Sequence, residues 1–126
     1  MRTAMGILQR ARELERETAE FLCEMIRVPS YSGQEKGVIE VIARRMREAG
    51  MDEVRIDGLG NVIGRLGNGP RIVAFDAHID TVETGDLSAW KTPPFDARIE
   101  GGHVIGRGSV DQEGGIVSRI REGVTN

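Results

Sequence analysis

The residues with the clearest chemical potential are a histidine and an aspartate two positions apart. His78 and Asp80 follow a short apolar run, Ile72-Val73-Ala74-Phe75. On a strand, side chains two residues apart point to the same side, so these two can act together. An imidazole beside a carboxylate is typical of a metal ligand and the group that orients it. The spacing therefore indicates candidate metal chemistry at the end of a strand.

The apolar run before His78 has the pattern of a covered strand. Continuous apolar stretches are typical of parallel strands that are buried on both faces, and open α/β sheets bind ligands beyond the carboxyl ends of their strands. The sequence predicts a buried strand around Val73 and Phe75 that delivers His78 to a ligand site.

The part of the chain before this strand has helical spacing. Apolar positions in residues 5–27 recur at the helical period with charged residues opposite them, and Pro29 ends this helix. Ser32 and Glu35 have the S-x-x-E spacing of a capping box, so a second helix is expected to begin there. Gly50 is expected to close this second helix in the left-handed conformation.

Strand and turn patterns occupy most of the remainder. Short strands are predicted at residues 54–56 and 61–66, and a β-hairpin is predicted around Gly101-Gly102. A further helix is expected from Ile116. Helices, then strands, then another helix indicate an α/β layer architecture.

Composition excludes several classes of partner. The 126 residues carry a net charge of -3 and include no basic run, which gives no basis for a nucleic-acid or anionic-membrane surface. No apolar run approaches the roughly 18 residues of a membrane span. The single cysteine, Cys23, fits a reducing cytoplasm, and its apolar neighbours predict a small buried side chain. We therefore expect a cytoplasmic protein without nucleic-acid or membrane partners.

Three other interpretations of the polar residues remain. Gly106-Arg107-Gly108 begins like a phosphate loop, although the third glycine is misplaced and no G-K-S/T follows. His78, Asp80 and His103 have the composition of a two-histidine, one-carboxylate iron site, although such sites usually lie inside a β-barrel. Taken singly, His78 could be a core histidine, and Asp111 could be a helix N-cap.

A series of short motifs between about Leu14 and Gly115 resembles the two-zinc metallopeptidases. This family includes acetylornithine deacetylase, succinyl-diaminopimelate desuccinylase, carboxypeptidase G and aminoacylase. The motifs follow the family's order and spacing, which is far more specific than H-x-D alone. They are Val28-Pro29-Ser30 with Gly33 and Glu35, Gly60-Asn61-Val62-Ile63-Gly64, Asp76-Ala77-His78-Ile79-Asp80-Thr81-Val82, Trp90 with Pro94-Phe95, and Gly106-Arg107-Gly108-Ser109-Val110-Asp111 with Gly114-Gly115.

The resemblance implies a fold and roles for three residues. The fold would be the N-terminal part of a three-layer α/β/α zinc-peptidase catalytic domain with a mixed sheet. His78 would bind a metal, Asp80 would be the catalytic-site carboxylate that orients the imidazole, and Asp111 would bridge two divalent ions. Zinc is the expected metal, and cobalt or manganese also suits such ligands. The Asp111–Gln112 peptide bond is expected to be cis, and Gln112-Glu113, in place of the usual Met-Lys, resembles the selenium-metabolism-linked hydrolases.

The reaction implied by the resemblance is hydrolysis of an amide in a small molecule, such as an N-acyl amino acid or a dipeptide-like compound. The family uses two metal ions and a glutamate general base from a Glu-Glu pair. That pair is absent here, as are a further acidic ligand, a C-terminal histidine and the lid domain. Residues 1–126 are therefore expected to be an incomplete N-terminal portion of the catalytic domain, truncated before the lid or dimerisation domain and inactive.

The alternative to an incomplete hydrolase is a non-catalytic fragment with at most weak metal binding. In either case, the predicted strand around Val73 would have an unpaired apolar edge, which favours self-association.

Overall fold

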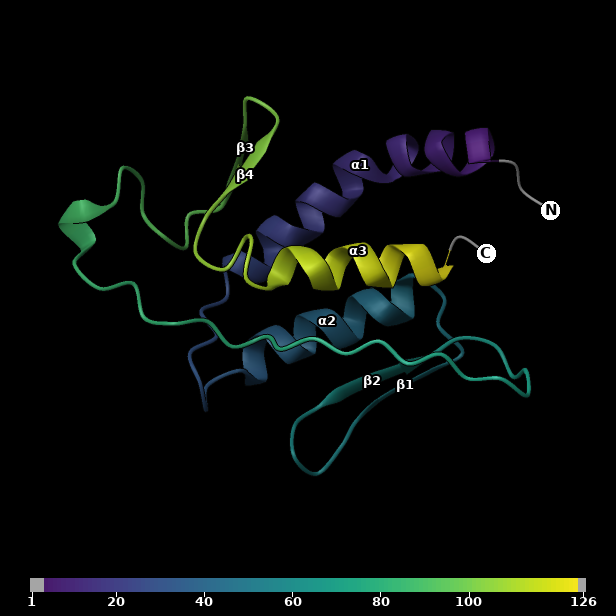
Figure 1. Ribbon diagram of the computed structural model, residues 1–126. Coiled ribbons are helices and arrows are strands. Elements are labelled where there is room, and N and C mark those ends of the chain that lie inside the picture. The colour runs from purple at the N-terminus through teal and green to yellow at the C-terminus, as the bar shows by residue number, and fades with distance from the viewer. Residues whose placement is uncertain (1–3, 125–126) are drawn as a thin grey trace.

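The computed structural model describes residues 4–124, which contain helices and two small antiparallel sheets. The elements are α1 (Ala4–Ile26), α2 (Lys36–Glu48), β1 (Glu53–Ile56), β2 (Val62–Arg65), the 3-10 helix η1 (Leu87–Ala89), β3 (Arg98–Glu100), β4 (His103–Ile105) and α3 (Glu113–Val124). α1 contacts α2, α3 and the β3–β4 hairpin, while α2 also contacts β1 and β2 (Figure 1). The predicted α/β class is confirmed.

The core lies where the C-terminal half of α1 meets α2 and α3. Phe21 and Met25 of α1 are fully buried, and Val38 and Ile42 of α2 and Val117 of α3 join the same cluster. All five belong to the apolar faces of their helices, and burial of such faces supplies most helical stability in proteins. The helical period therefore predicted this part of the core correctly.

The N-terminal half of α1 extends beyond the core (Figure 1). Ile7 and Leu8, which the period placed on the inward face, are 60% and 55% exposed. This half carries a local ion pair, Arg10–Glu13, at 3.2 Å. No helix in residues 4–124 combines the length and apolar character needed to cross a membrane.

The start of α2 differs from the expected capping box. The helix begins at Lys36, and its N-cap is Glu35, which makes no side-chain cap hydrogen bond. The Glu35 carboxylate instead accepts from the backbone N of Gly33 at 2.8 Å. The hydroxyl of Ser32 donates to the distant carboxylate of Asp80. At the other end Gly50 has φ +85°, so the predicted left-handed termination is confirmed.

The two predicted short strands and the predicted hairpin are present, and the two strands also pair as a hairpin. β1 and β2 pair antiparallel, and the turn between them is held by Asp57, whose carboxylate accepts from the backbone N of Leu59 and Asn61 at 2.9 Å. β3 and β4 pair around Gly101-Gly102. In the first turn Asp57 accepts hydrogen bonds from nearby backbone N–H groups, and in the second the two glycines adopt positive φ. Both effects depend on residues within the turn, which is why short-range patterns locate hairpins well.

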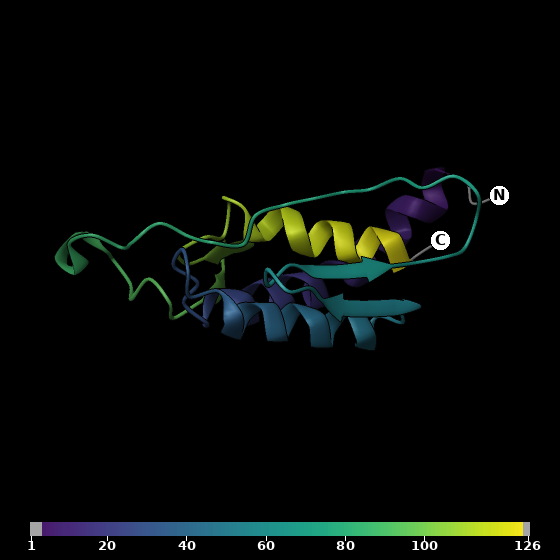
Figure 2. The same ribbon diagram turned by 90° about the horizontal axis from the view of Figure 1, so that it is seen from below.

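The predicted buried strand around Val73 and Phe75 is wrong for the structure described. This segment pairs with none of β1–β4, and Figure 2 shows it as an extended trace outside the helices. Ile72, Val73 and Phe75 are 83%, 77% and 73% exposed. A strand that is apolar on both faces needs pairing strands and cover on each face, and the elements between residues 4 and 124 do not provide them.

A matched pair of leucine substitutions on α1 tests the position of the core. Leu22 is 8% exposed and Leu8 is 55% exposed. Leu22→Ala should lower the free energy of unfolding by about 2–5 kcal/mol because it leaves a cavity, whereas Leu8→Ala should change it by less than about 0.5 kcal/mol. Urea unfolding followed by circular dichroism gives both values. Equal effects would contradict this placement of the core.

Cys23 provides a second test of the core. It is 3% exposed, as predicted, and burial raises the pKa of its thiol. Because the thiolate is the reactive form, Cys23 should react with Ellman's reagent at least about tenfold more slowly in the folded protein than in concentrated urea. The control is Leu8→Cys in a Cys23→Ala background, which places the thiol on the exposed part of the same helix. Similar rates for Cys23 in the folded wild type and for the Leu8→Cys thiol in the folded control would show that Cys23 is accessible.

Candidate metal site

Residues 78–81 are held beside the chain that follows α1. Tyr31 and Thr81 form an isolated parallel bridge, Thr81 N donates to Ser30 O at 2.8 Å, and Ser30 Oγ donates to Ile79 O at 3.0 Å. Ser30 and Thr81 are buried. Together these bonds fix the backbone from which the histidine and the first aspartate of the site project.

The glycine-rich segment, residues 106–111, lies against Thr81. Gly108 has φ +87°, and a Cβ at this position would lie 2.8 Å from Thr81 Cγ2 and 2.9 Å from Glu113 Oε2. Both the backbone conformation and the lack of space therefore require glycine. This close approach brings the segment that ends in Asp111 onto the segment that begins with His78.

Arg107 ties the long connection after Thr81 to the glycine-rich segment. Its guanidinium carbon lies 4.7 Å from the centre of the Trp90 ring, and its Nη2 donates to Glu83 O at 3.3 Å. Trp90 Nε1 in turn donates to Thr84 O at 2.9 Å. The sequence marked Arg107 and Trp90 only as parts of motifs, and no local pattern predicted that they would stack.

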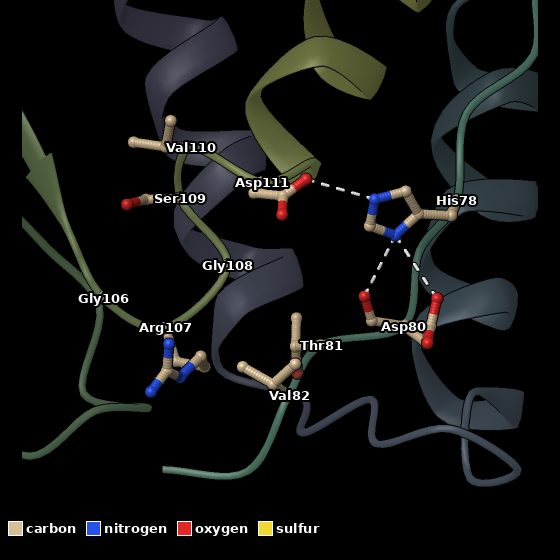
Figure 3. Close-up of a pocket in the computed structure, with 10 residues that line it drawn as sticks. All are labelled: His78, Asp80, Thr81, Val82, Gly106, Arg107, Gly108, Ser109, Val110 and Asp111. Atoms are coloured by element: carbon tan, nitrogen blue, oxygen red, sulfur yellow. Dashed lines mark hydrogen bonds and ion pairs between the residues drawn. The ribbon is translucent and has the colours of Figure 1, made fainter.

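The three residues predicted for the site come together in a cleft of about 300 Å³ (Figure 3). His78 Nε2 lies 3.1 Å from Asp111 Oδ1, and His78 Nδ1 lies 3.1 Å from Asp80 O and 3.3 Å from Asp80 Oδ1. The His78 side chain is 47% exposed, so it is not a core histidine. The expected cis peptide bond between Asp111 and Gln112 is also present.

The charges in the cleft favour a cation between His78 and Asp111. Hydrogen bonding to Asp111 raises the pKa of His78, and the hydroxyl of Ser32 is the main cause of the lowered pKa of Asp80. Both ring nitrogens of His78 face oxygen acceptors, but a neutral imidazole carries only one N–H. Either a second proton or a metal ion therefore has to balance the remaining acceptor.

The His78–Asp111 separation suits two ligands of one ion. With metal–nitrogen and metal–oxygen bonds of about 2.0–2.2 Å and tetrahedral angles, two donors stand about 3.4 Å apart. The observed 3.1 Å is a few tenths of an ångström shorter. However, no group of three or more potential ligands occurs among the side chains that the structure describes. The donors fit a divalent ion but make only part of its coordination shell.

The iron-site interpretation is wrong. His103 lies on β4, is exposed, and contacts Gly101 O through Nδ1 at 2.9 Å. It does not line the cleft with His78 and Asp80.

Two functional candidates were missed by the sequence reasoning. Ser32 was assigned to a helix cap, and its local spacing carried no signal of a contact with Asp80 48 residues away. Glu113 was noted only as a departure from the usual family residue. Its side chain is 1% exposed beneath Gly108, and burial raises its pKa to about 8.

Comparisons with known proteins agree with the family resemblance. The model of peptidase family M20/M25/M40 matches residues 74–121, which include both His78 and Asp111. The uncharacterized protein YgeY of Escherichia coli (strain K12) is 42% identical over 117 residues, which are 93% of this chain and 29% of YgeY. Succinyl-diaminopimelate desuccinylase of Azoarcus sp. (strain BH72) is 36% identical over 105 residues, 82% of this chain and 28% of the relative. Succinyl-diaminopimelate desuccinylase of Methylocella silvestris is 37% identical over 110 residues. The match covers 80% of this chain and 28% of the relative.

The chain thus spans less than a third of the length of these curated relatives. It matches them over 80% to 93% of its own length. These matches support assignment of this chain to peptidase family M20/M25/M40, whose model covers residues 74–121.

Proposed function

We propose that this chain supplies part of the metal centre of an amide hydrolase that acts on small molecules. His78 and Asp111 hold the ion, and Asp80 fixes the imidazole. The observation that carries the proposal is the 3.1 Å approach of Asp111 Oδ1 to His78 Nε2 while Asp80 occupies the Nδ1 side. An imidazole ligand needs this arrangement, because one nitrogen must face the ion while the other donates to a fixed acceptor.

The substrate class follows from the family and from the names of relatives. Two of these relatives are named succinyl-diaminopimelate desuccinylase, which describes removal of a succinyl group. N-acyl amino acids and dipeptide-like compounds are the proposed substrates of the whole protein. A bound divalent ion supplies Lewis-acid chemistry, polarising the scissile carbonyl and lowering the pKa of water.

Two ions are proposed for the complete site, with Asp111 able to offer one oxygen to each. Zinc is the first choice, and cobalt and manganese suit the same imidazole and carboxylate donors. Among the described side chains, His78 and Asp111 have no third ligand. We therefore propose that residues 1–126 supply only part of the ligand set of the catalytic domain, and that on their own they bind metal weakly and do not turn over substrate.

A non-catalytic fragment is the second candidate, and one specific observation favours it. The Asp111 side chain is 85% exposed, so water competes strongly for its carboxylate. Weak metal binding without hydrolysis is the outcome expected from such an open pair of donors.

We place the protein in the cytoplasm, in line with its single buried cysteine, and assign it no nucleic-acid or membrane partner. Disulfides are rare in that compartment. The net charge of -3 offers no attraction to polyanions.

We also propose that the chain associates with itself through the exposed apolar segment, residues 72–75. Three of its four side chains are large, apolar and more than 70% exposed. Contiguous apolar exposure of this kind is unusual in monomers, and an extended segment without a strand partner can pair with another copy.

Zinc titration tests the metal site. Wild-type protein should bind zinc weakly, and His78→Ala and Asp111→Ala should each reduce the affinity by about tenfold or more, because each removes a donor. Isothermal titration calorimetry measures the change. The matched control is His103→Ala, which removes the other histidine of the chain and should leave the affinity unchanged. An equal loss of zinc affinity in His103→Ala would show that zinc binds outside the cleft.

An amidase assay separates the two candidate functions. With N-acetyl amino acids the wild-type chain should show no turnover above buffer, because its ligand set is incomplete. Turnover that a chelator and His78→Ala both abolish would instead establish a working metal hydrolase and reject the non-catalytic candidate.

Sedimentation velocity tests the self-association. Wild-type protein should form concentration-dependent oligomers, and Val73→Lys with Phe75→Lys should shift it toward monomer, because charge on the segment opposes pairing. The control is Leu59→Lys, which charges an isolated apolar side chain that is 91% exposed. A wild-type monomer with a sharp cooperative unfolding transition would contradict the proposal.

A further inference from the structure

The hydroxyl of Ser32 is used by the site instead of by helix α2. Ser32 Oγ donates to Asp80 Oδ2 at 2.6 Å, across 48 residues of sequence. Ser32 lies on the surface, where a hydroxyl normally bonds water, so this short contact to a distant carboxylate needs a structural cause.

That cause is the pairing of the chain after α1 with residues 79–81. The parallel bridge between Tyr31 and Thr81 holds the two segments side by side, and the Ser32 hydroxyl, one residue after the bridge, reaches back to Asp80, one residue before it. Thr81 N also donates to Ser30 O at 2.8 Å, which fixes the register. The position of the hydroxyl is therefore set by backbone bonds on its N-terminal side.

The Asp80 carboxylate is held at both of its oxygens. Oδ2 accepts from Ser32, while Oδ1 lies 3.3 Å from His78 Nδ1. A carboxylate anchored at one oxygen cannot rotate the other away from the imidazole. Ser32, Asp80, His78 and Asp111 thus form one continuous chain of polar contacts.

We propose that Ser32 is a positioning residue for His78, acting through Asp80. By holding Asp80 Oδ1 toward Nδ1, it keeps the ring proton on that nitrogen and the lone pair of Nε2 directed toward Asp111. The effect on metal affinity rests on the function proposed above, whereas the effect on the imidazole does not.

The imidazole is examined first, in metal-free protein labelled with ¹⁵N-histidine. The chain has two histidines, and His103→Gln assigns their signals. At a pH where the ring is neutral, wild-type His78 should carry its proton mainly on Nδ1, because two acceptors face Nδ1 and one faces Nε2. Ser32→Ala should lower the ratio of the Nδ1–H to the Nε2–H tautomer by about two- to fivefold, the effect of losing one half-exposed hydrogen bond.

Two variants separate positioning from general structure. Ser32→Thr keeps the hydroxyl and should restore the wild-type tautomer ratio. Ser88→Ala removes another exposed serine, outside the cleft, and should have no effect. Because Ser32 is exposed, its truncation should preserve the fold, which the amide spectra of the same samples check.

Zinc affinity is then measured by calorimetry on the same proteins. Ser32→Ala should weaken binding by about two- to fivefold, with recovery in Ser32→Thr. If wild-type protein binds no zinc, the proposed function fails, and the tautomer ratio alone decides the role of Ser32. The same tautomer ratio in wild type and Ser32→Ala would overturn the proposal, as would an unchanged zinc affinity after the ratio has shifted.

Discussion

The candidate site depends on one close contact between two segments of the chain. Gly108 lies against Thr81 with no room for a side chain, and Thr81 is paired in turn with the residues after α1. Thr81 and Glu113, which flank Gly108, are almost fully buried. Separating these segments would expose the buried groups and break the short backbone bonds. The site geometry is therefore a consequence of core packing, even though its donor atoms are exposed.

Short-range interactions along the chain explain which parts of this structure could be predicted from the sequence. The buried half of α1 and the hairpins follow from periodicity and turn residues, which act over a few positions. The segment around Val73 shows the limit of such reasoning, because its composition describes a buried environment that other chain elements must provide. The nearness of His78 and Asp111 was implied only by the family resemblance, since periodicity carries no information over 33 residues.

Ser32 illustrates a different limit. Its S-x-x-E spacing satisfied a local rule for helix capping, yet the backbone pairing with Thr81 offered the hydroxyl a charged acceptor. Hydrogen bonds to charged groups are the stronger kind, so the distant partner is preferred over the local one. Glu113, in contrast, lies where its charged form is disfavoured. It is buried without a hydrogen-bond partner at Oε2 among the described residues, and the cost of its charge there appears as a pKa of about 8.

The separation of 33 positions between His78 and Asp111 also bears on the thermodynamics of the chain. An ion held by both side chains would close a loop of that length and reduce the number of conformations open to the unfolded state. For a permanent cross-link the chain-entropy limit is about 3–4 kcal/mol, a large share of the stability of a small domain. Folding and ion binding in this chain would then be linked equilibria, each strengthening the other.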